Sequence, residues 1–166
     1  MHKIVLLTGS NQGERLGLIR QAKQLLENEL GLCVKASSIY ESAPWGFESE
    51  TKFLNQVLLF FSDFGHQEIL RIGLKIETDL GRKREQMGYR SRAMDIDILF
   101  YDDKIVNEPD LQIPHPQLHK RRFTLEPLCE IMPDFIHPIL KKNLHELLSE
   151  CSDNLSVVKL GNENDL

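Results

Sequence analysis

Two aspartates separated by one residue, Asp95 and Asp97, are the side chains of this sequence best suited to chemistry. They lie in an apolar stretch that we expect to form a strand over 93–101. Because side chains alternate along a strand, both carboxylates leave one face while Ile96 and Ile98 enter the other. Two neighbouring like charges repel, and a hard cation such as Mg²⁺ removes that repulsion. On spacing alone, two exposed aspartates at a strand end explain the pair equally well.

A basic segment runs directly into these aspartates. Residues 82–92 hold one acid, Glu85, in a chain whose formal net charge is -5. The bases of the segment are Arg82, Lys83, Arg84, Arg90 and Arg92. Arginines can bind phosphate oxygens in pairs, so cations beside two carboxylates suit a nucleotide triphosphate with bound Mg²⁺. Taken alone, the segment fits a solvated charged run or an RNA contact just as well.

A histidine held between prolines is a third candidate. Pro114 and Pro116 restrict the backbone around His115, which excludes a helix interior there and argues against a helical zinc site shared with His119. A rigidly presented His followed by Arg121 suits phosphate binding. A histidine in a loop can equally be structural.

The fourth candidate is an amide at the start of a strand. Asn55 follows Phe53, and the long loop over 41–52 that precedes them carries Trp45 and Phe47. An amide can pair with the polar edge of a heteroaromatic ring while aromatic side chains stack on the face of that ring. The same aromatics could simply fill the core or anchor the loop.

The elements that must position these residues follow from hydrophobic periodicity. We expect strands over 3–8, 34–40, 53–61 and 93–101, helices over 18–30 and 69–80, and shorter helices over 125–131 and 144–151 after an extended, proline-bearing segment. The predicted class is α+β, a ferredoxin-like split βαβ sandwich of order βαββαβ with a C-terminal helical extension. We expect one domain over 1–166, with its core over 3–150 and a polar tail over 152–166.

Composition excludes several classes of protein. The negative net charge argues against general binding to nucleic acid or to an anionic membrane. The longest apolar run, 57–61, is too short to span a bilayer. Three scattered cysteines without a CxxC pair give no zinc ribbon or dithiol redox centre. The expected location is the cytoplasm.

The segment Arg92-Ala93-Met94-Asp95-Ile96-Asp97-Ile98 resembles the core motif of the 6-hydroxymethyl-7,8-dihydropterin pyrophosphokinase family of folate biosynthesis. Further segments agree with that family in order and spacing, and the resemblance covers about 4–148. These segments are Gly9-Ser10-Asn11, Ser37-Ser38-x-Tyr40, Phe53-Leu54-Asn55, residues 77–84, and Pro114-His115 through Arg121 and Phe123.

The resemblance implies an enzyme that transfers the pyrophosphoryl group of ATP to the hydroxymethyl oxygen of the pterin and releases AMP. It implies that Asp95 and Asp97 bind two Mg²⁺ ions and that Arg82 and Arg92 take part in catalysis. The implied ATP-binding residues are Glu77, Arg82, Arg84, Arg92, Ile98, Leu111, His115 and Arg121. The implied pterin-binding residues are Ser42, Pro44, Trp45, Phe53, Asn55, Asp95 and Phe123. The loops over 41–52 and 84–90 resemble mobile lids, and we expect a monomer without a fused second enzyme.

Four positions depart from the family pattern: Ala43, Phe53, Tyr89 and the pair Arg90-Ser91. They concern lid details and the polarity of the pterin site, and none removes a predicted metal ligand. The main alternative is a ferredoxin-like RNA-binding module that uses residues 82–92. The net charge, and the absence of a strand pattern with paired exposed aromatics, argue against it. A metal-dependent phosphohydrolase would need more His and Asp ligands near the aspartate pair.

Overall fold

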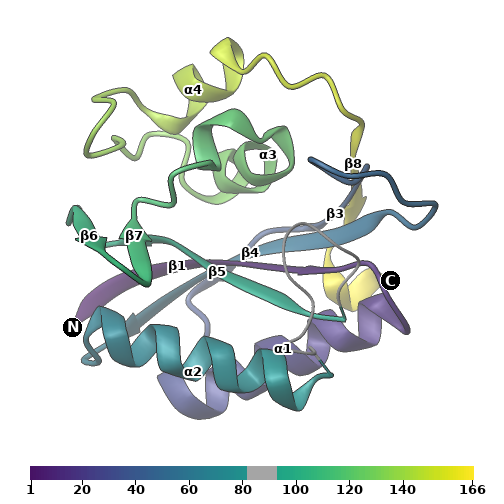
Figure 1. The fold of residues 1–166 in the computed structure, drawn as a ribbon, viewed down its shortest axis with the longest axis horizontal. Helices are drawn as coiled ribbons and strands as arrows, with labels where there is room; N and C mark the ends of the chain where they lie inside the picture. The colour runs from purple at the N-terminus through teal and green to yellow at the C-terminus, as the bar shows by residue number, and fades with distance from the viewer. Residues whose placement is uncertain (82–92) are drawn as a thin grey trace.

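The computed structural model describes residues 1–81 and 93–166. One layer of helices, a central sheet and a second layer of helices lie on top of one another (Figure 1). The elements are β1 (His2–Ser10), α1 (Arg15–Leu30), β2 (Lys35–Ala36), β3 (Ile39–Ser42), β4 (Phe53–Ser62), α2 (His66–Asp79), β5 (Asp95–Tyr101), β6 (Val106–Glu108), β7 (Leu111–Ile113), α3 (Arg122–Ile131), α4 (Leu144–Glu150) and β8 (Val157–Gly161). Two 3₁₀ turns span Leu118–Lys120 and Glu163–Asp165.

The main sheet is antiparallel, with strand order β5-β1-β4-β3-β8 and the short β2 paired to β4. Because β4 pairs with both β1 and β3, the two strands joined through α1 flank a third strand that comes later in the chain. The predicted mixture of helices with a sheet is therefore confirmed. None of the described helices is long and apolar enough to cross a membrane.

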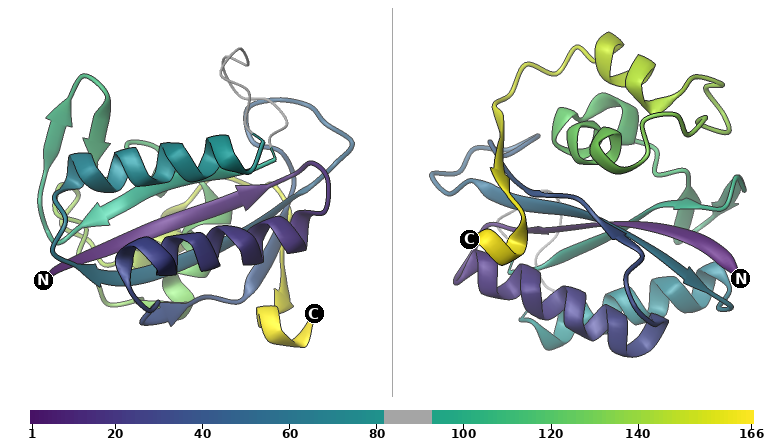
Figure 2. Two further views of the ribbon diagram at one scale, coloured as in Figure 1. Left: turned by 90° about the horizontal axis from the view of Figure 1, so that it is seen from below. Right: turned by 180° about the vertical axis from the view of Figure 1, so that it is seen from behind.

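Both faces of the sheet are buried, which explains the nearly continuous apolar sequence of β1 and β4. Side chains of one face pack against α1 and α2, which lie side by side across the sheet (Figure 2). They include Ile4, Leu6, Leu58, Phe60 and Ile98. Side chains of the other face pack under α3 and α4, and they include Val5, Leu7, Val57, Leu59 and Leu99. Each buried aliphatic side chain of this kind contributes roughly 1.5–3 kcal/mol to stability.

The expected second strand is divided in two. Ser37 lies between β2 and β3, and its hydroxyl accepts a hydrogen bond from the Val57 N–H at 2.9 Å. In a regular ladder, a backbone N–H such as that of Val57 donates to a backbone carbonyl of the neighbouring strand. Because this N–H donates to the Ser37 side chain instead, the strand is interrupted at Ser37. The proline-bearing segment contains a hairpin, β6–β7, and α3 begins at Arg122 rather than at 125.

The C-terminal segment differs most from the sequence-based expectation. Residues predicted as a polar tail form β8, which pairs with β3, and then reach α1 (Figure 2). There Lys23 forms an ion pair with Glu163, and Arg20 donates to the Leu166 carbonyl at 2.8 Å. The segment therefore covers an otherwise open strand edge.

Candidate active site

Three neighbouring strands supply the floor of the main pocket. In the register of the sheet, Gly9 of β1 lies directly between Asn55 of β4 and Asp95 of β5. Two residues earlier, Leu7 lies beside Asp97. These side chains share the sheet face that α3 covers farther along, so the predicted alternation of the aspartates is confirmed: Ile96 and Ile98 pack on the opposite face.

The absence of a side chain at Gly9 creates a hollow between the amide and the carboxylate. A Cβ atom at this position would lie 3.2 Å from Oδ1 of Asn55. Asn55 is only 2% exposed, and its Nδ2 donates to the Ser42 hydroxyl at 2.7 Å. The amide is therefore held in one place by a neighbouring strand, with its polar group at the edge of the hollow.

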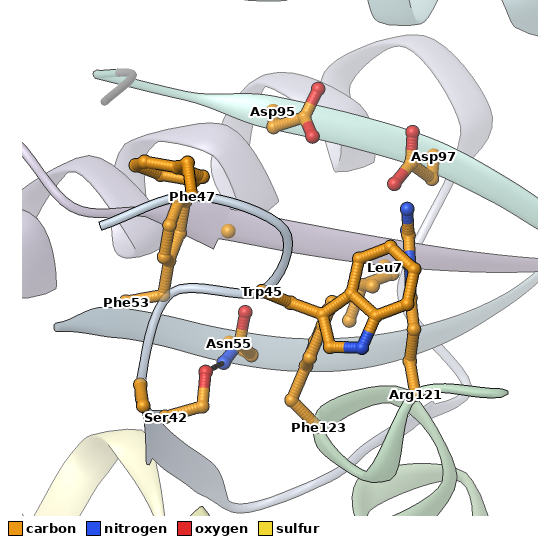
Figure 3. Close-up of a pocket in the computed structure, with 12 residues that line it drawn as sticks. Leu7, Ser42, Trp45, Phe47, Phe53, Asn55, Asp95, Asp97, Arg121 and Phe123 are labelled. Atoms are coloured by element: carbon orange, nitrogen blue, oxygen red, sulfur yellow. Dashed lines mark hydrogen bonds between the residues drawn. The ribbon is translucent and has the colours of Figure 1, made fainter. Parts of the chain in front are cut away.

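Aromatic side chains form the walls. Phe47 meets Phe53 edge to face, with ring centroids 6.0 Å apart. On the other side the Arg121 guanidinium lies 4.5 Å from the Trp45 ring centroid and 5.6 Å from that of Phe123 (Figure 3). The cation is almost buried, so its contacts with the two rings hold it in place. Among the described residues, those that line the pocket are Leu7, Gly9, Ser42, Ala43, Trp45, Phe47, Phe53, Asn55, Asp95, Asp97, Arg121 and Phe123.

A second, more open pocket lies along the edge strand β5. Its lining combines β5 with the β6–β7 hairpin and the segment after it: Leu70, Ile96, Asp97, Ile98, Pro109, Asp110, Leu111, Gln112, His115 and Pro116. Asp97 lines both pockets, so a ligand in one and a ligand in the other would meet at this carboxylate.

A bulge in β5 positions His115. The register between β1 and β5 shifts after Val5, which leaves Leu99 as the extra residue, and the Leu99 carbonyl accepts the His115 N–H at 3.1 Å. Nδ1 of His115 accepts the Gln117 N–H at 3.2 Å, so the proton of the neutral ring sits on Nε2. That Nε2 lies 4.0 Å from Oδ2 of Asp97.

The charge state of His115 follows from its surroundings. Burial, reinforced by the positive charge of Arg121, lowers the pKa of His115 to about 4, although Asp95 opposes the shift. The imidazole is therefore neutral at neutral pH. It offers an N–H donor toward the aspartates without adding a charge.

Glu77, predicted as an ATP ligand, lies elsewhere. It is 1% exposed and is not among the residues that line the two pockets. Its Oε2 accepts the backbone N–H of Ile96, the residue between the two aspartates, at 2.8 Å. The contact of this α2 carboxylate thus fixes the backbone that carries Asp95 and Asp97.

The structure brings most of the predicted site residues together. Of those assigned to the pterin, Ser42, Trp45, Phe53, Asn55, Asp95 and Phe123 line the main pocket. Pro44 is not in that lining, whereas its neighbour Ala43 is. Of those assigned to ATP, Ile98, Leu111 and His115 line the second pocket, and Arg121 lines the first. Arg82, Arg84 and Arg92 lie outside the described residues, as do Tyr89, Arg90 and Ser91 and the rest of the basic segment.

Sequence reasoning did not assign Leu7, Gly9, Ala43 or Phe47 to the site. Phe47 gave a usable signal, because a second large aromatic in a loop that already carries Trp45 suggests a ligand. Gly9 gave a weaker one. Gly9 matters because the register of the sheet places it between Asn55 and Asp95. No local sequence pattern predicts that register.

The donor set fits Mg²⁺ better than a transition metal. Within residues 1–81 and 93–166, no group of three or more His, Cys, Asp and Glu side chains could hold a metal ion. Asp95 and Asp97 offer carboxylate oxygens only, and both are partly exposed on the pocket side. Mg²⁺ commonly binds through one or two carboxylates and completes its octahedron with water and phosphate oxygens.

The comparisons with known proteins agree with this geometry. The family model described as 7,8-dihydro-6-hydroxymethylpterin-pyrophosphokinase (HPPK) matches residues 5–133. The chain is 43% identical over 150 residues to a 2-amino-4-hydroxy-6-hydroxymethyldihydropteridine pyrophosphokinase of Aquifex aeolicus, covering 90% of this chain and 92% of that relative. It is 39% identical to the protein of the same name from Bacillus subtilis over 124 residues, 74% of either chain.

Solved structures show the same fold at low identity. An HPPK-DHPS structure of Plasmodium falciparum with pteroate superposes with a TM-score of 0.74 at 15% identity, over 90% of this chain and 44% of that one. This chain thus spans less than half the length of that solved protein. The family model and the curated relatives settle the relationship: the chain belongs to the 7,8-dihydro-6-hydroxymethylpterin-pyrophosphokinase family.

Proposed function

We propose that this chain transfers the pyrophosphoryl group of ATP to the hydroxymethyl oxygen of 6-hydroxymethyl-7,8-dihydropterin and releases AMP. The observation that carries the proposal is the shared wall of the two pockets. Asp97 lines both, so an acceptor in one and a nucleotide in the other would meet where the carboxylates can hold a metal. Membership of the family supports the same reaction.

The pterin belongs in the main pocket. Its flat ring suits the space between Phe53 and Phe123, and its amide-like edge suits hydrogen bonding to Asn55. The hollow above Gly9 would admit the ring close to the sheet. This orientation directs the hydroxymethyl group toward Asp95 and Asp97.

ATP belongs in the second pocket. Ile98 and Leu111 supply apolar surface for the adenine. His115 of this pocket, and Arg121 from the adjoining main pocket, supply donors for phosphate oxygens. We assign further phosphate contacts to Arg82, Arg84 and Arg92 on the basis of the family motif. We assign Glu77 a supporting role through the Ile96 N–H.

Asp95 and Asp97 would hold two Mg²⁺ ions, and these ions, when bound, would neutralise phosphate charge. The protein contributes position and exclusion of water. The pterin hydroxyl oxygen forms a bond to the β-phosphorus and releases its proton to solvent. The bond from that phosphorus to the oxygen that bridges the α- and β-phosphates breaks, and AMP leaves with that oxygen. Trp45 and Phe47 close the pocket from the loop side and thereby limit attack by water.

Four broader assignments accompany this function. We propose the ferredoxin-like description because β5-β1-β4-β3 follows the order expected for βαββαβ. We propose a single domain over 1–166, because β8 joins the same sheet. We also propose a monomer. Free cysteines at positions 33, 129 and 151 suit the reducing cytoplasm, where we place the reaction.

The test is to incubate the protein with ATP and Mg²⁺, with and without the reduced hydroxymethylpterin, and to separate the nucleotides. AMP should form only when the pterin is present. Formation of ADP, or of AMP without pterin, would contradict the proposal. Binding of RNA through residues 82–92, the alternative function, receives no support from the family assignment.

A further inference from the structure

We propose that Arg15 is a positioning residue that holds the 43–52 loop, and with it Trp45 and Phe47, in place over the main pocket. Nη1 of Arg15 donates to Oε2 of Glu41 at 3.0 Å and to the Lys52 carbonyl at 2.8 Å. Glu41 lies in β3 just before the loop, and Lys52 is its last residue. One nitrogen therefore joins the two ends of the loop. As a role in pterin binding, the inference rests on the proposed function.

Strand pairing alone does not hold the loop at this point. The pairing of β3 with β4 ends at Ser42 and Phe53, so Lys52 lies beyond the ladder. Arg15, the first residue of α1, reaches it from a different part of the chain. The residue before Lys52 is held in the same way: Nδ2 of Asn11 donates to the Thr51 carbonyl, at the long distance of 3.5 Å. On the other arm, the Ala43 N–H donates to the Ser156 carbonyl at 3.1 Å.

The base of the loop is thus held from both sides, while its aromatic residues lie farther out. Trp45 reaches across to Arg121, and Phe47 packs edge to face on Phe53. A small rotation of the loop about its base would displace both rings. Arg15 fixes that base with two charge-assisted contacts, which are stronger than neutral hydrogen bonds.

Arg15 acts on the pocket only through the loop. It is not among the residues that line either pocket, and its side chain is 28% exposed while that of Glu41 is 27% exposed. Its removal should therefore weaken pterin binding and leave nucleotide binding and the chemical step largely unchanged. That pattern separates a positioning role from a general loss of folded protein.

Trp45 is the single tryptophan of the chain, so intrinsic fluorescence reports directly on this loop. The experiment compares the wild type with R15M and R15K, and uses R20M as the matched control. Arg20 is an exposed arginine of the same helix whose contacts go to the Glu163 and Leu166 carbonyls. Acrylamide quenching is measured without substrates, and the KM values for pterin and ATP and the kcat are then measured for each variant.

For R15M we expect quenching of Trp45 to increase about twofold and the KM for the pterin to rise about tenfold, as the loss of a charged hydrogen bond implies. The KM for ATP and the kcat should stay within about twofold. R15K, which keeps the charge and one donor group, should fall between R15M and the wild type. R20M should match the wild type in all four quantities.

Unchanged quenching in R15M, an equal rise in both KM values, or the same changes in R20M would each overturn the assignment. Should R15M fail to fold, E41Q weakens the same contact and should shift quenching and the pterin KM in the same direction. The quenching comparison needs no substrate. A wild type that makes no pterin-dependent AMP would therefore refute the proposed function, whereas unaltered quenching would refute the role of Arg15.

Discussion

The two pockets that meet at Asp97 are built in different ways. The floor of the main pocket comes from three adjacent strands, so the relative positions of Gly9, Asn55 and Asp95 are fixed by the register of the sheet. The second pocket joins the edge of β5 to a hairpin and a proline-bearing segment. Side chains anchored to a sheet can be placed more accurately than side chains on connecting segments.

The β6–β7 hairpin packs Leu111 and Ile113 into the core, and polar contacts also join it to α2. Nε2 of His66 lies 2.9 Å from Oε1 of Glu108, and Gln67 donates to Asp110 at 3.1 Å. These contacts are partly or wholly exposed and therefore contribute little to stability. We expect small changes to the main pocket to have sharp effects, and the second pocket to tolerate more variation.

The largest effect should come from the residue that the pockets share. Among the described residues, Asp97 is the only carboxylate that lines both pockets, and D97N removes its charge. A loss of several kcal/mol of charge stabilisation in the transition state corresponds to a loss in kcat of about a thousandfold. The rate of AMP formation measures it. D103N, at an exposed turn, serves as the control. A loss of less than about tenfold in D97N would remove the metal role of Asp97.

The next largest effect should be confined to the main pocket. N55A removes the amide group that is hydrogen-bonded to Ser42. The polar edge of the bound pterin then lacks its hydrogen-bond partner, and we expect kcat/KM for the pterin to fall about a hundredfold. The KM for ATP should not change. N28A, on the exposed side of α1, is the matched control. An equal loss for both substrates would show that the pockets are not separate.

A single methyl group should test the hollow above Gly9. In G9A the new Cβ lies 3.2 Å from Oδ1 of Asn55, whereas at Gly65 nothing lies within 4 Å of the equivalent atom. We expect the KM for the pterin to rise about tenfold, the loss associated with poor fit in a tight site. G65A should leave it unchanged. A wild-type KM in G9A would mean that the ring does not approach this part of the sheet.

The last prediction concerns the stability of the fold in acid, to which His115 of the second pocket contributes. The pKa of His115 is lowered from 6.5 to about 4, so burying the neutral ring stabilises the fold fully above pH 6.5 and progressively less as the pH falls toward 4. At about 1.4 kcal/mol per pKa unit, the full loss is roughly 3 kcal/mol.

H115N should remove this contribution to the pH dependence. Urea unfolding at pH 7.5 and at pH 5 should show a smaller difference in the free energy of unfolding for H115N than for the wild type. Exposed His145 provides the control variant H145N, which should behave as the wild type. The buried His137, whose pKa is also lowered to about 4 by burial and by His119, accounts for acid sensitivity that remains in H115N.

The sequence predicts best what depends on local pattern. Alternation places Asp95 and Asp97 on one face, and Phe53, Asn55 and Val57 on one face of their strand, and both placements are confirmed. Spacing also indicates most of the elements, because runs of apolar residues at strand or helix period recur between turns. The family motif names residues that the structure then gathers around two connected pockets.

What sequence could not supply depends on contacts between distant segments. β8 forms because β3 has an open edge and because Lys23 forms an ion pair with Glu163. The sequence of residues 157–161 alone indicates neither partner. The placement of Glu77 behind β5 likewise requires the docking of α2. In the sequence Arg15 looks like an ordinary helical residue. Only the structure shows that it lies beside both ends of the 43–52 loop.

The bulged edge strand β5 has a consequence for the behaviour of the protein at high concentration. An edge strand with open backbone groups can recruit a strand from another molecule and start aggregation. Here the Ile96 N–H donates a hydrogen bond to Glu77, and the Leu99 carbonyl accepts one from the His115 N–H. The bulge at Leu99 also interrupts the regular spacing of the backbone groups along β5. The contacts that aim the site residues thus also make β5 a poor template for pairing between molecules.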